Sequence, residues 1–383
     1  MEAVLENKQK KKNWILIVLN ALKRFFTNPT TLYIIKRLLT SFITLLLLAA
    51  LVTALLRLLP DEKFYNTAKY MKIYSQAGEA AADRYVWSQL FKNGIVDVNN
   101  NRVSVFESIF KFLYYIFPIP KQIPVRWSSD YSKVLKYWEG LIYLGESSKF
   151  DNALVLDIFL DRCGISFFIS MITVVLTYIV SVPLGIAMAK KPGGTVDKIG
   201  NIFIVLNYAI PALVFYLIMN KVFGLINVDG RSFFNFRYDS NNPVITLFPP
   251  LFCMWFLSIP GVVIWVRRFM TDELSSDYVK FARSKGLSEQ TIFYKHVFRN
   301  AIVPLVRNIP ATIIFAFVGS YYVETIWGIP GTGNMLVTFL SVTNPDVQGI
   351  QSLTVIYGAM SILAFLLGDI ITVFFDPRIK LTD

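Results

Sequence analysis

Apolar runs long enough to cross a membrane recur along this chain, and they restrict its fold more than any other feature. Six runs cover residues 32–58, 164–189, 199–223, 244–266, 301–323 and 353–375. A helix needs about 20 predominantly apolar residues to cross the hydrocarbon core of a bilayer. Hydrophobic residues make up 54% of the 383 residues, above the share of about 45–50% in soluble domains. The sequence therefore predicts an all-α polytopic membrane protein with six transmembrane helices.

The basic residues indicate how the chain is oriented in the membrane. The formal net charge is +12, and Lys and Arg cluster beside the apolar runs, in segments 8–24, 190–198, 267–268 and 378–380. Short loops rich in Lys and Arg stay on the cytoplasmic side. We therefore expect both termini, and the loop after the fourth run, to be cytoplasmic. The basic residues form no face with interleaved aromatics, so nucleic acid is not expected as a partner.

The spacing of the runs divides the chain into four parts. Between the first and second runs lies a segment of about a hundred residues, whose aromatic content is sufficient for a small folded domain. The predicted parts are a cytoplasmic N-terminal segment with a helix on the membrane surface (1–31), transmembrane helix 1 (32–58), an extracellular domain (59–161), and a core with transmembrane helices 2–6 (162–383).

Within the predicted extracellular domain, residues 105–117 form an apolar stretch that is too short to span a bilayer. The stretch carries Glu107 and Lys111, so a buried or interfacial helix is expected. The prolines that follow, beginning at Pro118, favour an extended backbone.

A polar island, residues 270–300, lies between the fourth and fifth runs. Small and charged residues with good helix propensity fill 276–285, and Gly286 stands where a helix needs a left-handed residue to end. Ser288 is a suitable N-cap for a second helix, with Glu289 behind it. A short helix, a glycine break and a second helix predict a compact projection that fits a groove on a partner. An ordinary solvated loop is the alternative.

This island resembles the EAA loop of ABC-importer permeases, in the version found in the oligopeptide and dipeptide permease family. The general motif begins with Glu-Ala, whereas Lys280 and Phe281 stand there in this chain, as is usual for the peptide branch. Further matches extend from about Leu144 onward, including 323–336, which is similar to VETVF-x-x-PG-x-G-x-L. The family pattern DYV-x-x-A-R-x-K-G-L-S-E, then RNA-x-x-P, is matched by Asp277, Tyr278, Val279, Ala282, Arg283, Lys285, Gly286, Leu287, Ser288 and Glu289, then by Arg299, Asn300, Ala301 and Pro304.

The resemblance implies a type I ABC importer permease, B-type, with the extracellular domain inserted between helices 1 and 2. Such a subunit translocates oligopeptides or dipeptides by alternating access. Its implied partners are a second permease subunit, two ATP-binding subunits, an extracellular peptide-binding protein and membrane lipid. The residues implied to couple the chain to the ATPase are Asp277, Tyr278, Ala282, Arg283, Lys285, Gly286, Leu287, Ser288 and Glu289.

No catalytic residue, metal site or cofactor is expected on this chain. The sequence has no GxxxxGK[ST] motif, so ATP and Mg are expected on the partner ATPase subunits. Residues 328–333, GIPGTG, superficially resemble a phosphate-binding loop, but they follow a membrane helix instead of a strand.

Glycines and Pro330 instead predict a re-entrant turn at the outer mouth of a pathway. Glu324, which precedes this turn near a span end, is compatible with either a functional or an interfacial role. The candidate pathway or gate residues are Asn207, Tyr208, Pro211, Tyr322, Glu324, Gly328, Pro330, Gly331 and Gly333.

Three alternatives remain open. The first is a permease of the same family that imports nickel or another small solute. The polar island indicates binding to an ATPase partner and carries little information about the cargo. An ion-coupled secondary transporter requires inverted repeats or ion ligands at mid-membrane, which the runs lack apart from Glu324 and polar residues such as Asn207. An intramembrane enzyme requires a nucleophile with a base or a metal cluster, and the single histidine, His296, lies outside the runs.

Overall fold

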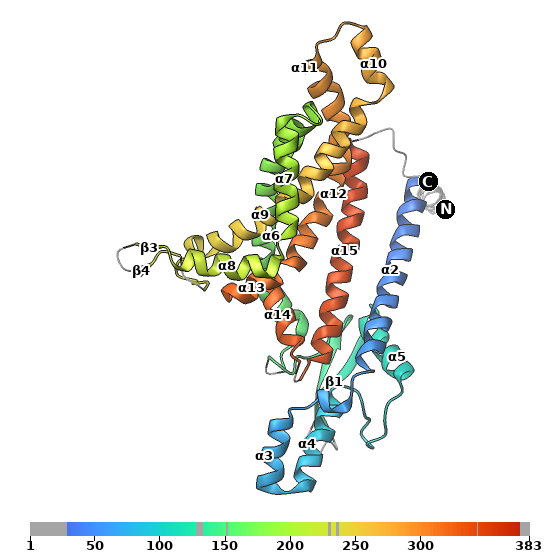
Figure 1. Cartoon of the computed structure of the whole chain (residues 1–383). Helices are drawn as coiled ribbons and strands as arrows, with labels where there is room; N and C mark the ends of the chain where they lie inside the picture. Colours follow the sequence, from blue (N-terminus) through green and yellow to red (C-terminus); the bar gives the residue numbers. More distant parts are fainter. Residues whose placement is uncertain are drawn as a thin grey trace, which may run out of the picture.

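The computed structural model describes residues 29–127, 133–150, 152–228, 231–234, 237–342 and 344–375. Long helices form an elongated bundle, with a short-helix projection at one end and an inserted region, residues 57–154, at the other (Figure 1). The surface helix expected within residues 1–31 falls almost entirely outside the described residues.

The element bounds are as follows. The long helices are α2 (Pro29–Leu56), α6 (Val155–Lys190), α9 (Pro243–Leu274), α12 (Phe298–Gly319) and α15 (Val347–Phe375). The shorter helices are α3 (Thr67–Ala77), α4 (Glu79–Lys92), α5 (Val105–Ile116), α7 (Thr195–Ala209), α8 (Ala212–Gly224), α10 (Asp277–Ser284), α11 (Glu289–Thr291), α13 (Tyr321–Trp327) and α14 (Thr332–Phe339). A 3-10 turn covers Asp61–Lys63 and a π-helical turn covers Ile292–Val297. Strands β1 (Lys121–Trp127) and β2 (Val134–Gly140) form one antiparallel hairpin, and β3 (Asn227–Val228) and β4 (Arg231–Ser232) form another.

Five of the six apolar runs fold as helices that are long and apolar enough to span a membrane. They are Ile35–Leu56, Val155–Lys190, Pro243–Leu274, Glu289–Trp327 and Val347–Thr372. Most of these helices extend beyond the runs that predicted them. The expectation of an all-α chain is corrected in one respect, because the chain also contains two short β-hairpins.

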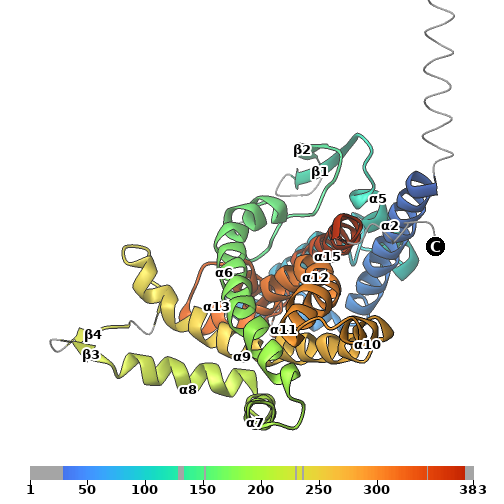
Figure 2. The ribbon, with the colours of Figure 1, turned by 90° about the horizontal axis from the view of Figure 1, so that it is seen from above.

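The third run, 199–223, folds as two helices, α7 and α8, which count as one span only if the bent pair is taken together. α7 and α8 meet at 92°, and Ile210 between them has extended backbone at φ −88 and ψ 119. Pro211 explains the break, because proline disfavours helical backbone in the preceding residue and has no N–H to continue the ladder. α7 runs along the bundle, whereas α8 turns across its edge toward β3 and β4 (Figures 1 and 2).

Buried ion pairs tie the helices together at the end of the bundle that carries α10. Asp369 of α15, whose side chain is 8% exposed, pairs with Arg37 of α2 at 2.6 Å and with Arg307 of α12 at 2.9 Å. Asp197 of α7 pairs with Arg267 of α9 through two contacts of 2.6 and 2.9 Å. Ionisable groups inside membrane bundles are usually paired in this way, so these acids have structural partners in the resting chain.

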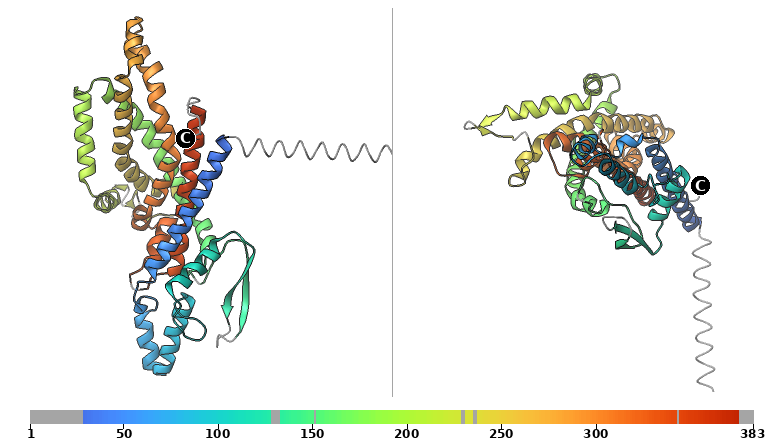
Figure 3. Two further views of the ribbon diagram at one scale, coloured as in Figure 1. Left: turned by 90° about the vertical axis from the view of Figure 1, so that its right-hand side faces the viewer. Right: turned by 90° about the horizontal axis from the view of Figure 1, so that it is seen from below.

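The inserted region and the α10–α11 projection lie at opposite ends of the bundle (Figure 1, and Figure 3, left). The region contains the α3–α4 helix pair, α5 and the β1–β2 hairpin, in which Lys121 pairs with Gly140. The extended stretch predicted after Pro118 is confirmed as β1.

Candidate functional site

The polar island, residues 270–300 and hereafter the coupling loop, folds as the helix, glycine break and helix that its sequence predicts. α10 ends at Ser284, and Gly286 follows two residues later with a φ of +75. The Leu287 N–H donates to the Ala282 carbonyl at 3.3 Å, and the Gly286 N–H donates to the Arg283 carbonyl at 2.9 Å. This pair of bonds is a Schellman motif, which requires a left-handed residue at the position of Gly286. The predicted glycine stop is therefore confirmed.

Ser288 begins the second helix, as its N-cap position predicts. Its hydroxyl accepts from the Thr291 N–H at 3.3 Å. Arg283 reaches across the glycine break and donates to both carboxylate oxygens of Glu289, at 2.8 and 3.2 Å. The pair is solvent-exposed and so adds little stability. Its bidentate geometry nevertheless orients the two helices relative to one another.

One side of the coupling loop is buried in the bundle. Val279, Ile292 and Val297 are each 0% exposed. They pack in one cluster with Met270 of α9 and Ala189 of α6. Tyr278 adds a hydrogen bond from its hydroxyl to Glu273 at 2.6 Å, and burial, together with this bond, raises the pKa of Tyr278 to about 12. The loop is thus fixed to two spans and can move only with them.

The opposite side of the coupling loop presents apolar side chains to the surroundings. Phe281 is 61% exposed and Leu287 is 40% exposed, and the Lys285 ammonium lies 4.5 Å from the Phe281 ring. The π-helical turn adds Tyr294, which is 48% exposed. The sequence did not predict this turn, since no local residue pattern specifies a π turn. Of the predicted coupling residues, Ala282 is buried, Tyr278 is partly buried, and Asp277, Arg283, Lys285, Gly286, Leu287, Ser288 and Glu289 are exposed.

Glu324 holds the turn between α13 and α14. The side chain is 0% exposed. One carboxylate oxygen accepts from the Ser320 hydroxyl at 2.6 Å, and the other accepts from the N–H groups of Gly333 and Asn334 at 2.6 and 3.1 Å. Those N–H groups belong to the first turn of α14, so Glu324 caps that helix from a distance. Neither of the two roles considered from the sequence included this cap.

The glycines of the turn are required by close contacts. A Cβ on Gly333 would lie 2.3 Å from the Tyr321 Cα, and a Cβ on Gly331 would lie 2.4 Å from a Glu324 carboxylate oxygen. Gly328 ends α13 with left-handed backbone, at φ +65. The Thr332 N–H donates to the Ser166 hydroxyl of α6 at 2.9 Å. The predicted turn thus exists, and it is packed tightly against α6.

The structure does not bring all the predicted pathway residues to one place. Tyr208 lines a cavity of about 620 Å³ between α6, α9 and α12, whereas the turn from Glu324 to Gly333 does not. Asn207 is buried, and its amide donates to the Phe256 carbonyl at 3.1 Å. Pro211 lies at the α7–α8 break, and Tyr322 stands beside Tyr321 on α13. Pro330 lies inside the turn.

Other cavity residues escaped the sequence reasoning. Polar side chains from three helices line the cavity, and they carry little signal in sequence because they are scattered within apolar runs. They are Thr173, Thr177 and Tyr178 on α6, Ser258 on α9, and Asn308 and Thr312 on α12.

Comparisons with known proteins identify the family. Residues 181–381 match the family described as binding-protein-dependent transport system inner membrane component. The oligopeptide transport system permease protein AmiC of Streptococcus pneumoniae is 37% identical over 213 residues, covering 56% of this chain and 42% of AmiC. This chain thus spans less than half the length of AmiC. The peptidoglycan transport system permease protein YejB of Agrobacterium fabrum is 30% identical over 265 residues, covering 63% of this chain and 69% of YejB.

Among solved structures, the inward-facing MetNI methionine ABC transporter aligns with a TM-score of 0.45 and 17% identity, over 58% of this chain and 97% of that chain. The family match covers the coupling loop, the Glu324 turn and the cavity-lining helices α9 and α12, and it extends over more than half of the sequence. This chain is therefore a multi-pass membrane protein that belongs to the family of binding-protein-dependent transport system inner membrane components.

Proposed function

We propose that this chain is the membrane-spanning permease subunit of an ATP-driven ABC importer that carries oligopeptides or dipeptides into the cell. The observation that carries the proposal is the coupling loop. Its sequence follows the peptide-branch pattern, one side is anchored in the bundle, and the other side presents Phe281, Leu287 and Tyr294 to a partner. The similarity to AmiC, a protein named for oligopeptide transport, supports the peptide class.

The proposed orientation places the coupling loop and both termini in the cytoplasm, and the inserted region outside. The partners are a second permease subunit, two ATP-binding subunits that hold ATP and Mg, and an extracellular peptide-binding protein. The chain itself is proposed to bind no cofactor. Six spans of the type I permease kind follow if α7 and α8 count as one broken span.

The contacts of the coupling loop support a lever mechanism. Closure of the ATPase dimer displaces the exposed side of the loop. Because Val279 and Ile292 belong to one buried cluster with Met270 of α9, and the π-helical turn continues into α12, both helices follow that displacement. α9 and α12 are two of the three walls of the 620 Å³ cavity, so their movement changes access to it. Alternating access is then a population shift between two arrangements of the same helices.

The cavity lining favours peptide over nickel as cargo. Among the described residues that line it there is no Asp, Glu, Lys, Arg, His or Cys. Nickel sites draw on imidazole, thiolate or carboxylate ligands, which this lining does not provide. Hydroxyl, phenol and amide groups instead match the donors and acceptors of a peptide backbone. The Thr173 hydroxyl also has no hydrogen-bond partner among the described residues, although it is buried at the cavity wall. A water or substrate group can satisfy it.

Replacing both Phe281 and Leu287 by aspartate tests the proposed contact with the ATPase. Burying one such side chain is worth about 1.5–3 kcal/mol, so losing either weakens the affinity for the ATPase about tenfold or more. We expect the co-expressed ATP-binding subunits to disappear from the purified complex, while the chain still inserts. Val342→Asp is the matched control, because Val342 is 81% exposed and lies at the opposite end of the bundle. ATP-binding subunits recovered equally with both variants would exclude the coupling loop as their docking site.

A further inference from the structure

Helix α5 of the inserted region lies along the membrane span α2. α5 begins beside Arg57, whose guanidinium donates to the Val103 carbonyl just before the helix starts. It ends beside Phe42, whose ring lies 5.8 Å from the ring of Phe117. Between these points Phe112 and Ile116 pack in one cluster with Ala49. Figure 1 and the left view of Figure 3 show the two helices side by side.

The contacts place α5 well below the outer end of the α2 span, which ends at Leu56. Helices rise about 1.5 Å per residue, so Ala49 lies about 10 Å below that end and Phe42 about 20 Å below it, measured along the helix. The hydrocarbon core is about 30 Å thick. The C-terminal half of α5 is therefore at membrane depth, although α5, with 12 residues, is too short to span.

One face of α5 presents three exposed aromatic side chains, and the Lys121 ammonium lies 4.9 Å from the ring centroid of one of them, Tyr114. Phe106, Phe110 and Tyr114 recur every fourth residue and are 76%, 69% and 47% exposed. This stripe continues an exposed leucine face of α2, in which Leu47 is 65% and Leu51 is 57% exposed. A face that continues the lipid-facing surface of a span, at the depth of that span, has acyl chains as its neighbour.

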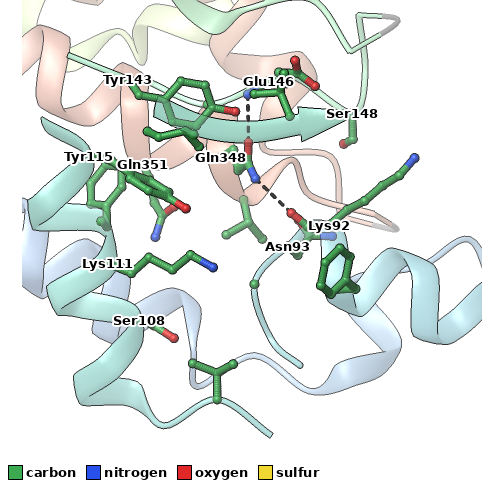
Figure 4. Close-up of a pocket in the computed structure, with 18 of the residues that line it drawn as sticks. Lys92, Asn93, Ser108, Lys111, Tyr115, Tyr143, Glu146, Ser148, Gln348 and Gln351 are labelled. Carbon is green, nitrogen blue, oxygen red and sulfur yellow. Dashed lines mark hydrogen bonds between the residues drawn. The ribbon is translucent and has the colours of Figure 1, made fainter. Parts of the chain in front are cut away.

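The opposite face of α5 is polar and borders a cavity of about 720 Å³ between α2, α4, α5 and the start of α15. Figure 4 shows Lys111 pointing into this cavity, with Ser108 and Tyr115 on the same helix and Gln351 of α15 across from them. Lys111 makes no hydrogen bond or ion pair within the described part of the chain. An ammonium at membrane depth needs a water-filled cavity or a paired group, and a cavity of about 720 Å³ has room for water.

The carbonyl groups at the C-terminal end of α5 are satisfied by a side chain of the protein, as a site without water requires. The last carbonyls of a helix have no partner within the helix. Here a single ammonium, that of Lys121, donates to the carbonyls of Tyr114, Tyr115 and Phe117, the last two at 2.9 and 2.6 Å. Lys121 itself is only 6% exposed. In hydrocarbon each unsatisfied carbonyl costs several kcal/mol, so an internal cap replaces the hydration that a surface helix receives from water.

We propose that α5 is a re-entrant membrane helix that enters the bilayer from the outer side. Its aromatic face contacts the acyl chains of the outer leaflet, and its polar face forms the wall of a water-filled inlet that extends below the membrane surface. The segment 59–161 is then only partly extracellular. The proposed orientation of the chain is needed only to say that the leaflet which α5 enters is the outer one. The inference does not depend on the cargo.

Site-directed spin labelling in liposomes tests this placement without any transport assay. Single cysteines replace Phe106, Phe110, Tyr114, Ser108 or Lys111 in a background in which Cys163 and Cys253 are alanine. Nitroxides at positions 106, 110 and 114 are expected to collide with oxygen more than with a water-soluble nickel chelate. Labels at positions 108 and 111 are expected to show the reverse. Because the helix points inward, the ratio of oxygen to nickel collisions should rise from 106 to 110 to 114.

Two results overturn the proposal. High nickel accessibility at all five positions places α5 in water, and equal ratios at 106, 110 and 114 place it flat on the membrane surface. If the cysteine-free background does not fold, the wild-type protein in liposomes can be labelled with an aryl-carbene precursor dissolved in the hydrocarbon. This labelling also distinguishes a re-entrant α5 from an α5 outside the bilayer. Labelling of the α5 peptide at the level of the α2 peptide supports re-entry, whereas labelling at the lower level of α3 and α4 refutes it.

Discussion

Gly286→Pro is expected to abolish coupled transport while the membrane bundle stays folded. Gly286 has φ +75, whereas proline fixes φ near −65° and has no N–H. The variant therefore loses the left-handed stop and the bond from the Gly286 N–H to the Arg283 carbonyl. Proline at a position with an incompatible φ destabilises the native backbone by more than about 1 kcal/mol. The loss affects the connection between two helices, each of which is anchored separately in the bundle. The loop is expected to rearrange, so that ATPase closure no longer moves α9 and α12.

Gly286→Asn is the matched control for the proline variant. Asparagine adopts left-handed backbone more readily than other residues with a Cβ, and no atom lies within 4 Å of a Cβ placed at position 286. The measurement is ATP hydrolysis and uptake by the reconstituted complex. We expect near wild-type uptake with asparagine and a loss of at least about tenfold with proline, the change that about 1.4 kcal/mol produces. Equal uptake by the two variants would show that the glycine stop plays no part in coupling.

Glu324→Ala is expected to destabilise the folded chain by a few kcal/mol, because each buried donor left without a partner costs about 1–3 kcal/mol. The substitution removes both carboxylate oxygens, and with them the acceptors of the Gly333 and Asn334 N–H groups and of the Ser320 hydroxyl. Two buried donors in the first turn of α14 are then left without a partner. Thermal unfolding of the purified chain in lipid nanodiscs measures the loss.

Glu324→Gln separates hydrogen bonding from charge at this position. The amide oxygen can accept from both N–H groups, and the amide nitrogen can donate to the Ser320 hydroxyl, which is able to accept. We therefore expect glutamine to retain most of the stability that alanine loses. An alanine variant as stable as the wild type would mean that the turn does not depend on Glu324. A glutamine variant as unstable as alanine would mean that the turn depends on the negative charge.

The coupling loop was predictable because its signals are local. A glycine stop and a serine cap act through neighbouring backbone groups, and both Gly286 and Ser288 do in the fold what their positions indicate. The apolar runs located five long helices for a similar reason. Hydropathy does not sense a bend, however, so within the third run only Pro211 indicates a helix kink, and the size of the 92° bend is not encoded in the run.

The remaining features depend on contacts that one sequence does not specify. Glu324 meets the first turn of α14 only because α13 and α14 fold back on one another, and Tyr208 meets Thr177 and Asn308 only because three spans converge. The amphipathic pattern predicted α5 as a buried or interfacial helix. Its depth is set by packing on Ala49 and Phe42 of α2, which no pattern within α5 encodes.

Uptake into proteoliposomes tests the central claim most directly. The vesicles contain this chain, the second permease subunit and the two ATP-binding subunits, with the peptide-binding protein outside and a radiolabelled short peptide as cargo. We predict peptide uptake that requires ATP inside the vesicle and the binding protein outside, that persists when ion gradients are collapsed, and that is absent with nickel as cargo. Peptide uptake driven by an ion gradient without ATP, or ATP-driven uptake of nickel but not of peptide, would contradict the assignment.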